Sequence, residues 1–222
     1  MKKLFVLLFF CTITTQAQLS SYRYKQALEN LNQSGWHSLT LPITIFDRME
    51  SYNDLRIYGI SVTDTIEVPY MMADTVVATQ TITHFAVKND KASKHTIIDV
   101  KLPEILLLGK VAIHPATTYD YYRSVKILQN ETTDDTYLSS VVKGVLDSKG
   151  NNTYTFAPQL FKHLQIDIDN QDNTPLSISE ITLFPITYKL TARFPDTAHH
   201  YFLVYGKAND IAPQYDITHF VK

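Results

Sequence analysis

Apolar and polar side chains alternate along much of this 222-residue chain, and this period of two constrains the fold more than any other feature. Successive side chains of a β-strand point to opposite faces of a sheet, so alternation places one set on a core and the other in solvent. Helical periodicity is weak by comparison. The clearest alternating segments are residues 55–60, 81–87, 96–100, 124–128, 164–168 and 201–205. The sequence therefore predicts an all-β protein.

Polar, turn-rich stretches separate these segments at residues 88–94, 129–135, 147–152 and 169–174. Short strands divided by regularly spaced turns are typical of β-sandwiches. The stretch 88–94 breaks two strand patterns with charged and small residues, which favours a boundary there. We therefore expect two modules, an N-terminal β-sandwich over residues 18–88 and a second β-sandwich over residues 89–222.

Three local features refine this expectation. Tyr24, Ala27, Leu28 and Leu31 fit either one face of a helix or the entry to a strand. Pro42 predicts a single helical turn within residues 43–49, because proline is tolerated at the first helical position. Trp36, the only tryptophan, is followed by the alternating Leu39 and Leu41, and we expect it to anchor the core rather than to contact a ligand.

The first seventeen residues read as a secretory signal peptide. Met1-Lys2-Lys3 supplies the positive charge, residues 4–11 form an apolar run too short to span a bilayer, and Ala17 suits cleavage before Gln18. An uncleaved anchor and a lipoprotein with lipid on Cys11 are the alternatives, but Phe9 and Phe10 are too bulky for a lipidation site. We expect an exported protein of the bacterial periplasm or cell envelope.

The exported chain must fold without disulfides, because Cys11 is the only cysteine. A net charge of -2 and a pI near 6.4 give no basic surface for nucleic acid. After residue 17 no apolar run is long enough for a transmembrane helix, and the longest, residues 105–108, predicts a buried strand. We expect no nucleic-acid partner and no membrane-spanning helix in the mature chain.

Familiar catalytic patterns are missing from the sequence. None of the eight histidines has the spacing that puts two metal ligands on one helix, and neither a Gly-x-Ser-x-Gly elbow nor a phosphate-binding glycine loop occurs. The sequence therefore predicts no cofactor and no metal. Calcium is the one alternative with any pattern, because oxygen ligands crowd at Asp167, Asp169, Gln171, Asp172 and Asn173. A solvated turn between two strands explains the same residues.

Several segments of the chain resemble an uncharacterised family of bacterial envelope proteins, domain of unknown function 3999. In the first half the resemblance lies in Trp36-His37-Ser38-Leu39-Thr40-Leu41-Pro42, in residues 54–59 and in Glu67-Val68-Pro69-Tyr70. In the second half it lies in residues 122–127, 164–170, 175–178, 201–206 and 212–216. That half is similar to the part of the family with a discoidin-like, galactose-binding-type sandwich. The resemblance implies two jelly-roll β-sandwich modules and says little about chemistry.

Members of that family usually continue into a C-terminal membrane helix, whereas this sequence ends at Lys222 without one. The sequence is therefore that of a shortened relative or of a fragment, and the resemblance implies no membrane anchor here.

The strongest candidate ligand contacts are Tyr119, Tyr121, Tyr122 and Arg123, which combine aromatic stacking surface with a fixed cation. On a strand, Tyr119 and Tyr121 would share one face and Tyr122 would take the other. We expect a non-catalytic binding module whose partner is an envelope glycan or an envelope protein. The alternative is a glycan-processing enzyme that uses Glu104 with Asp120 or Asp134 as a carboxylate pair.

Overall fold

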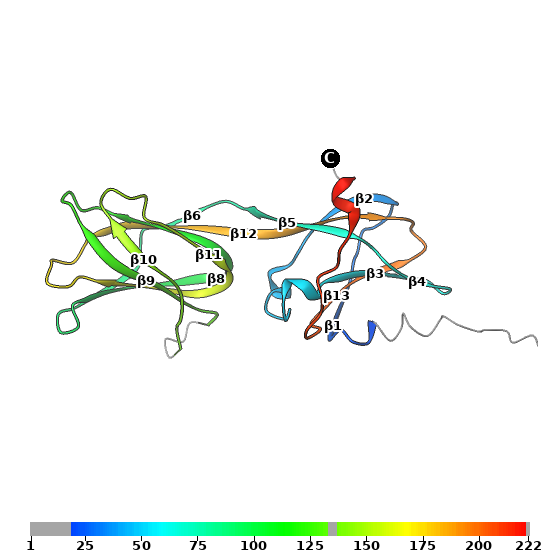
Figure 1. The fold of residues 1–222 in the computed structure, drawn as a ribbon, viewed down its shortest axis with the longest axis horizontal. Coiled ribbons are helices and arrows are strands. Elements are labelled where there is room, and N and C mark those ends of the chain that lie inside the picture. The colour runs from blue at the N-terminus through cyan, green and yellow to red at the C-terminus, as the bar shows by residue number, and fades with distance from the viewer. Residues whose placement is uncertain (1–18, 133–136, 221–222) are drawn as a thin grey trace, which may run out of the picture. The chain divides into compact units, whose positions relative to one another are not determined.

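The computed structural model describes residues 19–132 and 137–220, and apart from a helical residue at Leu19 the regular elements within them are strands and three single-turn 3-10 helices (Figure 1). The expected signal peptide, residues 1–17, lies outside the described residues, as does Asp134. The first seven strands are β1 (Tyr24–Ala27), β2 (Gly35–Thr40), β3 (Arg56–Ile60), β4 (Thr65–Glu67), β5 (Tyr70–Val76), β6 (Gln80–Ile82) and β7 (Ala86–Asp90). The others are β8 (His95–Pro115), β9 (Tyr122–Asn130), β10 (Ser139–Asp147), β11 (Thr153–Asp169), β12 (Ile178–Phe194) and β13 (His200–Tyr205).

The short helices are η1 (Ile43–Ile45), η2 (Tyr52–Asp54) and η3 (Asp216–His219). Pro42 precedes η1 as its N-cap residue, so the helical turn predicted after this proline is confirmed. Tyr24 and Ala27 bound β1, which decides between the two readings of that segment in favour of a strand. The all-β prediction is confirmed.

The chain divides into two compact units. The first consists of the described residues within Met1–Ala73 and Lys189–Lys222, and the second is Asp74–Tyr188. The division differs from the boundary expected at residues 88–94. Those residues end β7 and turn into β8, with Val87 opposite Ile98 and Asp90 opposite His95, so they lie inside the second unit. A polar, turn-forming sequence can connect two strands of a β-hairpin just as it can connect two domains.

The first unit is built around an antiparallel sheet in the order β1-β13-β3-β4. The end of β12 forms a second ladder with β2, in which Leu190 lies opposite Leu39. The rings of Phe194 on β12 and Tyr201 on β13 meet edge to face at 4.7 Å between centroids, so side chains of both ladders share one core.

Trp36 does not anchor the core of this unit, contrary to the prediction from the sequence. Its side chain is 43% exposed, whereas Leu41 is buried. Positions 36 and 39 differ by an odd number, so on a strand the tryptophan faces away from the surface that carries Leu39 and Leu41. The alternation predicted the strand correctly, but the residue was assigned to the wrong face.

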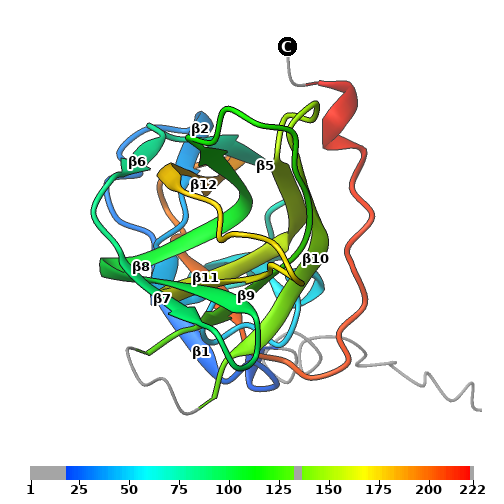
Figure 2. The ribbon, with the colours of Figure 1, turned by 90° about the vertical axis from the view of Figure 1, so that its left-hand side faces the viewer.

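The second unit is a curled antiparallel β-sandwich (Figure 2). One layer has the order β7-β8-β11-β9-β10, and the other contains β6, β12 and the remaining halves of β8 and β11. Register shifts in β11 between Thr155 and Gln159 and between Phe161 and His163 allow one long strand to serve both layers.

The core of this sandwich comes from alternate positions of its strands. Val125 and Ile127 of β9 lie beside Leu164, Ile166 and Ile168 of β11, all at most 1% exposed. The predicted alternation of residues 124–128 and 164–168 is therefore realised on the core face. The ends of β9 and β10 and the loops beside them carry the polar residues of the candidate site.

Candidate functional site

The four residues singled out from the sequence lie together at the start of β9, but their side chains have different environments. Tyr119 and Tyr122 are 49% and 67% exposed, whereas Tyr121 and Arg123 are only 9% and 7% exposed. Tyr119 and Tyr121 do not share a face, because β9 begins at Tyr122 and the residues before it form a loop without the period of two.

Three of these residues line an open pocket of about 440 Å³ in the second unit. Its walls come from the loop before β9, from the turn after β10 and from the loop between β11 and β12. The lining residues are Asp120, Tyr121, Tyr122, Arg123, Asp147, Ser148, Lys149 and Asn173. Tyr119 lies next to this set in the chain but does not line the pocket.

The β10–β11 turn is held in place by hydrogen bonds to the loop before β9 and within itself. Ser148 N donates to Tyr121 O at 3.1 Å, and Lys149 N donates to Asp147 Oδ1 at 2.9 Å. Asp147 N donates to Asn152 Oδ1 at 2.8 Å, while Asn152 itself has a left-handed φ of 47°. These bonds give the pocket wall a defined backbone before any ligand binds.

Tyr121 acts as a structural support of this wall. Its ring belongs to the apolar core, and its hydroxyl accepts a hydrogen bond from Asn152 Nδ2 at 3.3 Å. Tyr121, a candidate ligand contact from the sequence, is 9% exposed, so most of its ring lies in the core and little of it is open to stacking.

Arg123 is the most unusual side chain of the pocket. The alternation of β9 turns it inward, and its Nη1 donates to the carbonyl of Tyr122 at 3.0 Å. Its Nε atom is buried without a partner. Across residues 19–132 and 137–220, no carboxylate oxygen forms an ion pair with its guanidinium within 4.0 Å. Arg123, a candidate ligand contact from the sequence, is thus a buried cation that lacks a counterion among the described residues.

The other polar groups of the pocket provide both acceptors and a second cation. Ser148 Oγ donates to Asp120 Oδ1 at 3.3 Å, and Asp147 accepts from the turn backbone. Lys149 is exposed at the rim. The pocket therefore offers donors, acceptors and the exposed residue Tyr122 in one place.

The structure does not bring the proposed catalytic carboxylates together at this pocket. Glu104 is exposed on β8 and is not a lining residue, although Asp120 is. Asp134, the other partner considered, lies outside the described residues.

The residues considered for calcium form a turn whose side chains have protein partners. Asp169 Oδ1 accepts from Gln171 N at 2.9 Å, Asp172 pairs with Lys94 at 2.6 Å, and Asn173 Nδ2 donates to Asn170 O. Among the described residues no group of three or more His, Cys, Asp or Glu side chains is arranged to hold a metal ion.

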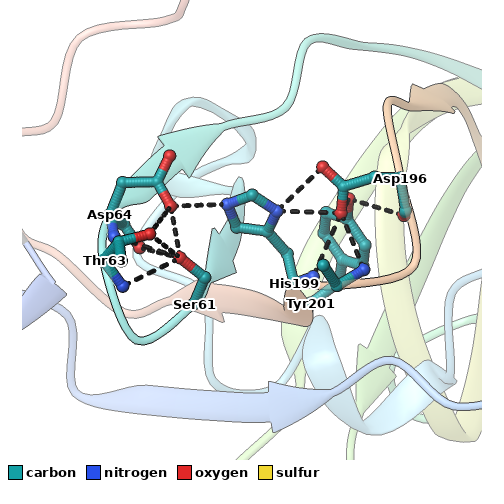
Figure 3. Close-up of polar contacts among 7 residues, drawn as sticks. Ser61, Thr63, Asp64, Asp196, His199 and Tyr201 are labelled. Atoms are coloured by element: carbon teal, nitrogen blue, oxygen red, sulfur yellow. Dashed lines mark hydrogen bonds and ion pairs between the residues drawn. The ribbon is translucent and has the colours of Figure 1, made fainter.

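A second polar cluster lies in the first unit, where His199 bridges two loops (Figure 3). Its Nε2 is 3.0 Å from Asp64 Oδ1, and its Nδ1 is 2.9 Å from Asp196 Oδ1. The bond to Asp196, joined by that to Asp64, raises the pKa of His199. We call His199, Asp64 and Asp196 the histidine clasp. Both ring nitrogens lie within hydrogen-bond distance of carboxylates. The histidine clasp therefore links two loops, and neither nitrogen of His199 is free to act as a catalytic base.

A third cluster surrounds Arg56 on β3. Its Nη2 pairs with Asp210 at 3.0 Å, its Nη1 donates to the carbonyls of Asn53 and Leu55, and Tyr22 OH donates to Asp210 Oδ2 at 2.8 Å. Burial raises the pKa of Tyr70 to about 12, so this phenol stays neutral and donates to Leu55 O. The network ties the chain around Asp210 to β3, and its charges are mutually compensated.

Some of the residues that line the pocket at the start of β9 could be predicted from the sequence. The cluster of residues 119–123 marked one wall, but Asp147, Ser148 and Lys149 were not singled out, and Asn173 was considered only as a calcium ligand. They lay within stretches predicted as turns, and only the pairing of β9 with β10 and β11 brings these turns beside Arg123.

No family model matches the chain, so the resemblance to domain of unknown function 3999 stays a prediction. A search of curated proteins found no match either. Among the residues described, no helix has both the length and the apolar character needed to cross a membrane.

Among solved structures, the chain is similar to family 32 carbohydrate-binding modules. The module of AlyQ, in complex with 4,5-unsaturated mannuronic acid, is 17% identical with a TM-score of 0.38, over 51% of this chain and 98% of that one. The module of NanJ from C. perfringens, in complex with galactose, is 14% identical with a TM-score of 0.30, over 60% of this chain and 98% of that one. The likeness is remote at these values and does not by itself define a ligand.

Proposed function

We propose that this protein is an exported, non-catalytic glycan-binding protein that holds a saccharide in the pocket at the start of β9. The observation that carries the proposal is the pocket itself, in which Tyr122, Arg123 and Asp120 converge on one open cavity of about 440 Å³. A sugar presents hydroxyls that both donate and accept, together with an apolar ring face. Asp120 and Asp147 can accept from hydroxyls, Arg123 can donate to them, and an exposed phenol ring can stack.

The support for export is the N-terminal sequence, with its two lysines and short apolar run before Ala17. An all-β protein without cysteines after residue 17 needs no oxidative folding in the periplasm or envelope. The support for a binding rather than a catalytic role is the open pocket, whose two carboxylates are engaged by turn hydrogen bonds. An envelope glycan is the partner that fits both parts of the proposal.

The test is native gel electrophoresis of the purified chain through gels that contain individual bacterial and plant polysaccharides, which retard a protein that binds them. Tyr122→Ala should weaken retention by the bound polysaccharide about fivefold, since loss of an aromatic contact costs roughly 1 kcal/mol. Tyr137→Ala is the matched control, because Tyr137 is 82% exposed and does not line the pocket. Equal retention of both variants, or release of reducing ends from the polysaccharide, would contradict the proposal.

A further inference from the structure

Arg123 combines deep burial with a lack of counterions, and this combination bears on the class of saccharide. Only 7% of the residue is exposed, and in the described part of the chain its guanidinium makes one hydrogen bond, to the carbonyl of Tyr122. We infer that the pocket selects saccharides that carry a carboxylate, such as hexuronic acids, and that Arg123 binds this carboxylate. The inference rests on the proposed function, since it names the ligand class of the same pocket.

A guanidinium stays positively charged inside a protein at any physiological pH. Burial of a cation without a partner is unfavourable, so buried charges are normally paired. Arg123 has five N–H donors, of which Nη1 uses one, and its Nε is buried without a partner. Because Nε has no exposed surface, a ligand in the pocket can supply acceptors only to the N–H groups of Nη1 and Nη2.

The carboxylates already present in the pocket do not fill this role. Asp120 and Asp147 line the cavity, but neither forms an ion pair with Arg123 within 4.0 Å. Asp120 accepts from Ser148 Oγ, and Asp147 accepts from Lys149 N, so the turn holds both in place. Their oxygens remain suited to accept hydrogen bonds from sugar hydroxyls.

A sugar acid matches this arrangement of charges in a way that other ligands do not. Its carboxylate can form two parallel hydrogen bonds with a guanidinium, and its hydroxyls can face Asp120 and Asp147. Lys149 at the rim adds a second favourable charge. A doubly charged phosphate would meet stronger repulsion from the two aspartates, and a neutral hexose would leave the charge of Arg123 uncompensated.

The test compares pairs of methyl glycosides that differ only at C6, where one carries a carboxylate and the other a hydroxymethyl group. Binding of the glucose, galactose and mannose pairs to the full chain is measured by titration calorimetry. We expect the acid of at least one pair to bind on the order of tenfold more tightly than its neutral partner, because charge-assisted hydrogen bonds are the stronger ones. This preference should shrink as salt is raised from 50 to 500 mM in the buffer, by screening.

Two substitutions assign the preference to Arg123. R123Q should abolish the preference for the acid, whereas R123K should keep part of it, because lysine retains the charge but lacks the planar fork. K143Q is the control, since Lys143 is exposed on neighbouring β10 and its loss changes the net charge equally. If R123Q does not fold, the R123K result and the salt dependence of the unaltered protein decide the question.

The outcomes separate the two proposals. Neutral sugars that bind as tightly as their acids in every pair, or 6-phosphates that bind more tightly than the acids, would overturn the carboxylate inference and leave glycan binding intact. An R123Q variant that folds and retains the preference for the acid would overturn the role of Arg123. If neither the glycosides nor any polysaccharide binds, the proposed function itself fails.

Discussion

His199 joins two loops of the first unit through both of its ring nitrogens, and its charge state decides how strong this link is. The carboxylates that face it are Asp64, in the loop after β3, and Asp196, in the loop after β12. Ser61 Oγ also donates to Asp64 Oδ1, and Tyr201 OH donates to the backbone carbonyl of Asp196. A protonated ring donates to both carboxylates at once, whereas a neutral ring has only one N–H to offer.

The histidine clasp therefore predicts a pH-dependent stability. The pKa of His199 is raised above 6.5 in the folded protein, so its contribution is fully present below pH 6.5 and is lost as the pH rises through the folded pKa. The urea midpoint should fall between pH 6 and pH 9, and His199→Gln should flatten this dependence.

The control for this experiment is His37→Gln, a histidine of the same unit that bonds to the carbonyl of Gln33. It should keep the slope of the unaltered protein. The pKa values of Asp64 and Asp196 are lowered, by Ser61 and by His199 first of all, so their part of the clasp is lost only in acid, below about pH 4. A slope that persists in His199→Gln would show that other groups dominate.

Gly59 illustrates how closely β3 and β13 approach. A Cβ atom at this position would lie 2.6 Å from Cε1 of Tyr201, a ring that is 4% exposed. Gly59→Ala should therefore lower the free energy of unfolding by about 1–3 kcal/mol through overpacking. Differential scanning calorimetry measures the change. Gly109→Ala is the control, because its nearest neighbour is 3.7 Å away, and an equal loss in both would refute the steric explanation.

At the scale of elements, alternation located the centres of strands but not their lengths or partners. Residues 96–100 and the apolar run 105–108 belong to one strand, β8, because a long bent strand can serve two layers of a sandwich. Residues 81–87 were expected to form one strand but contain the end of β6 and the start of β7, which pair with β12 and β8 respectively. The sequence of one strand does not show which distant strand will form hydrogen bonds with it.

The candidate site, too, could be predicted only in part, because its residues come together through pairing between distant strands. Tyr122 and Arg123 could be singled out because aromatic rings and a cation stand together in the sequence. The burial of Arg123 could be read only after the start of β9 was known, because a shift of one residue reverses the face of every side chain. The contributions of Asp147 and Asn173 depend on sheet pairing across the sandwich and have no local signature.

The turn after β10 offers a test of how the pocket wall is held. Asn152→Ala removes the acceptor of Asp147 N and the donor to Tyr121 OH, and it places alanine at a left-handed φ of 47°. Asn152→Gly removes the same bonds but tolerates the φ. The alanine variant should be less stable than the glycine variant by about 1 kcal/mol, as measured by chemical denaturation. A glycine variant that is the less stable of the two would contradict this account.

At the scale of the whole molecule, the second unit is a continuous segment, whereas the first is made from both ends of the sequence. Val77 N donates to Pro185 O at 2.9 Å, which joins the two ends of the inserted segment. A fragment of residues 74–188 contains β6 to β11 and the part of β12 that pairs with β8.

This organisation predicts which fragments fold. Residues 74–188 alone should give a dispersed amide spectrum by NMR and a cooperative thermal transition, because the strands of its sandwich are present. Residues 89–222 lack β6 and most of β7 and also lack β1 and β3, the neighbours of β13, so this fragment should be less resistant to protease. A stable fragment 89–222 beside an unfolded fragment 74–188 would favour the boundary expected from the sequence instead.

The placement of β13 between β1 and β3 also has a consequence for how the protein is made. β3 ends at Ile60, but its neighbour β13 begins only at His200, so at ~5–20 residues per second β3 waits roughly 7–28 s for this partner during translation. Throughout that interval β3 can pair with β4 on one edge, but its other edge, where Ile57 and Tyr58 meet β13 in the finished sheet, has no neighbour. We therefore expect the free edge of β3 to be open to chaperones, or to pairing with other chains, until β13 has emerged.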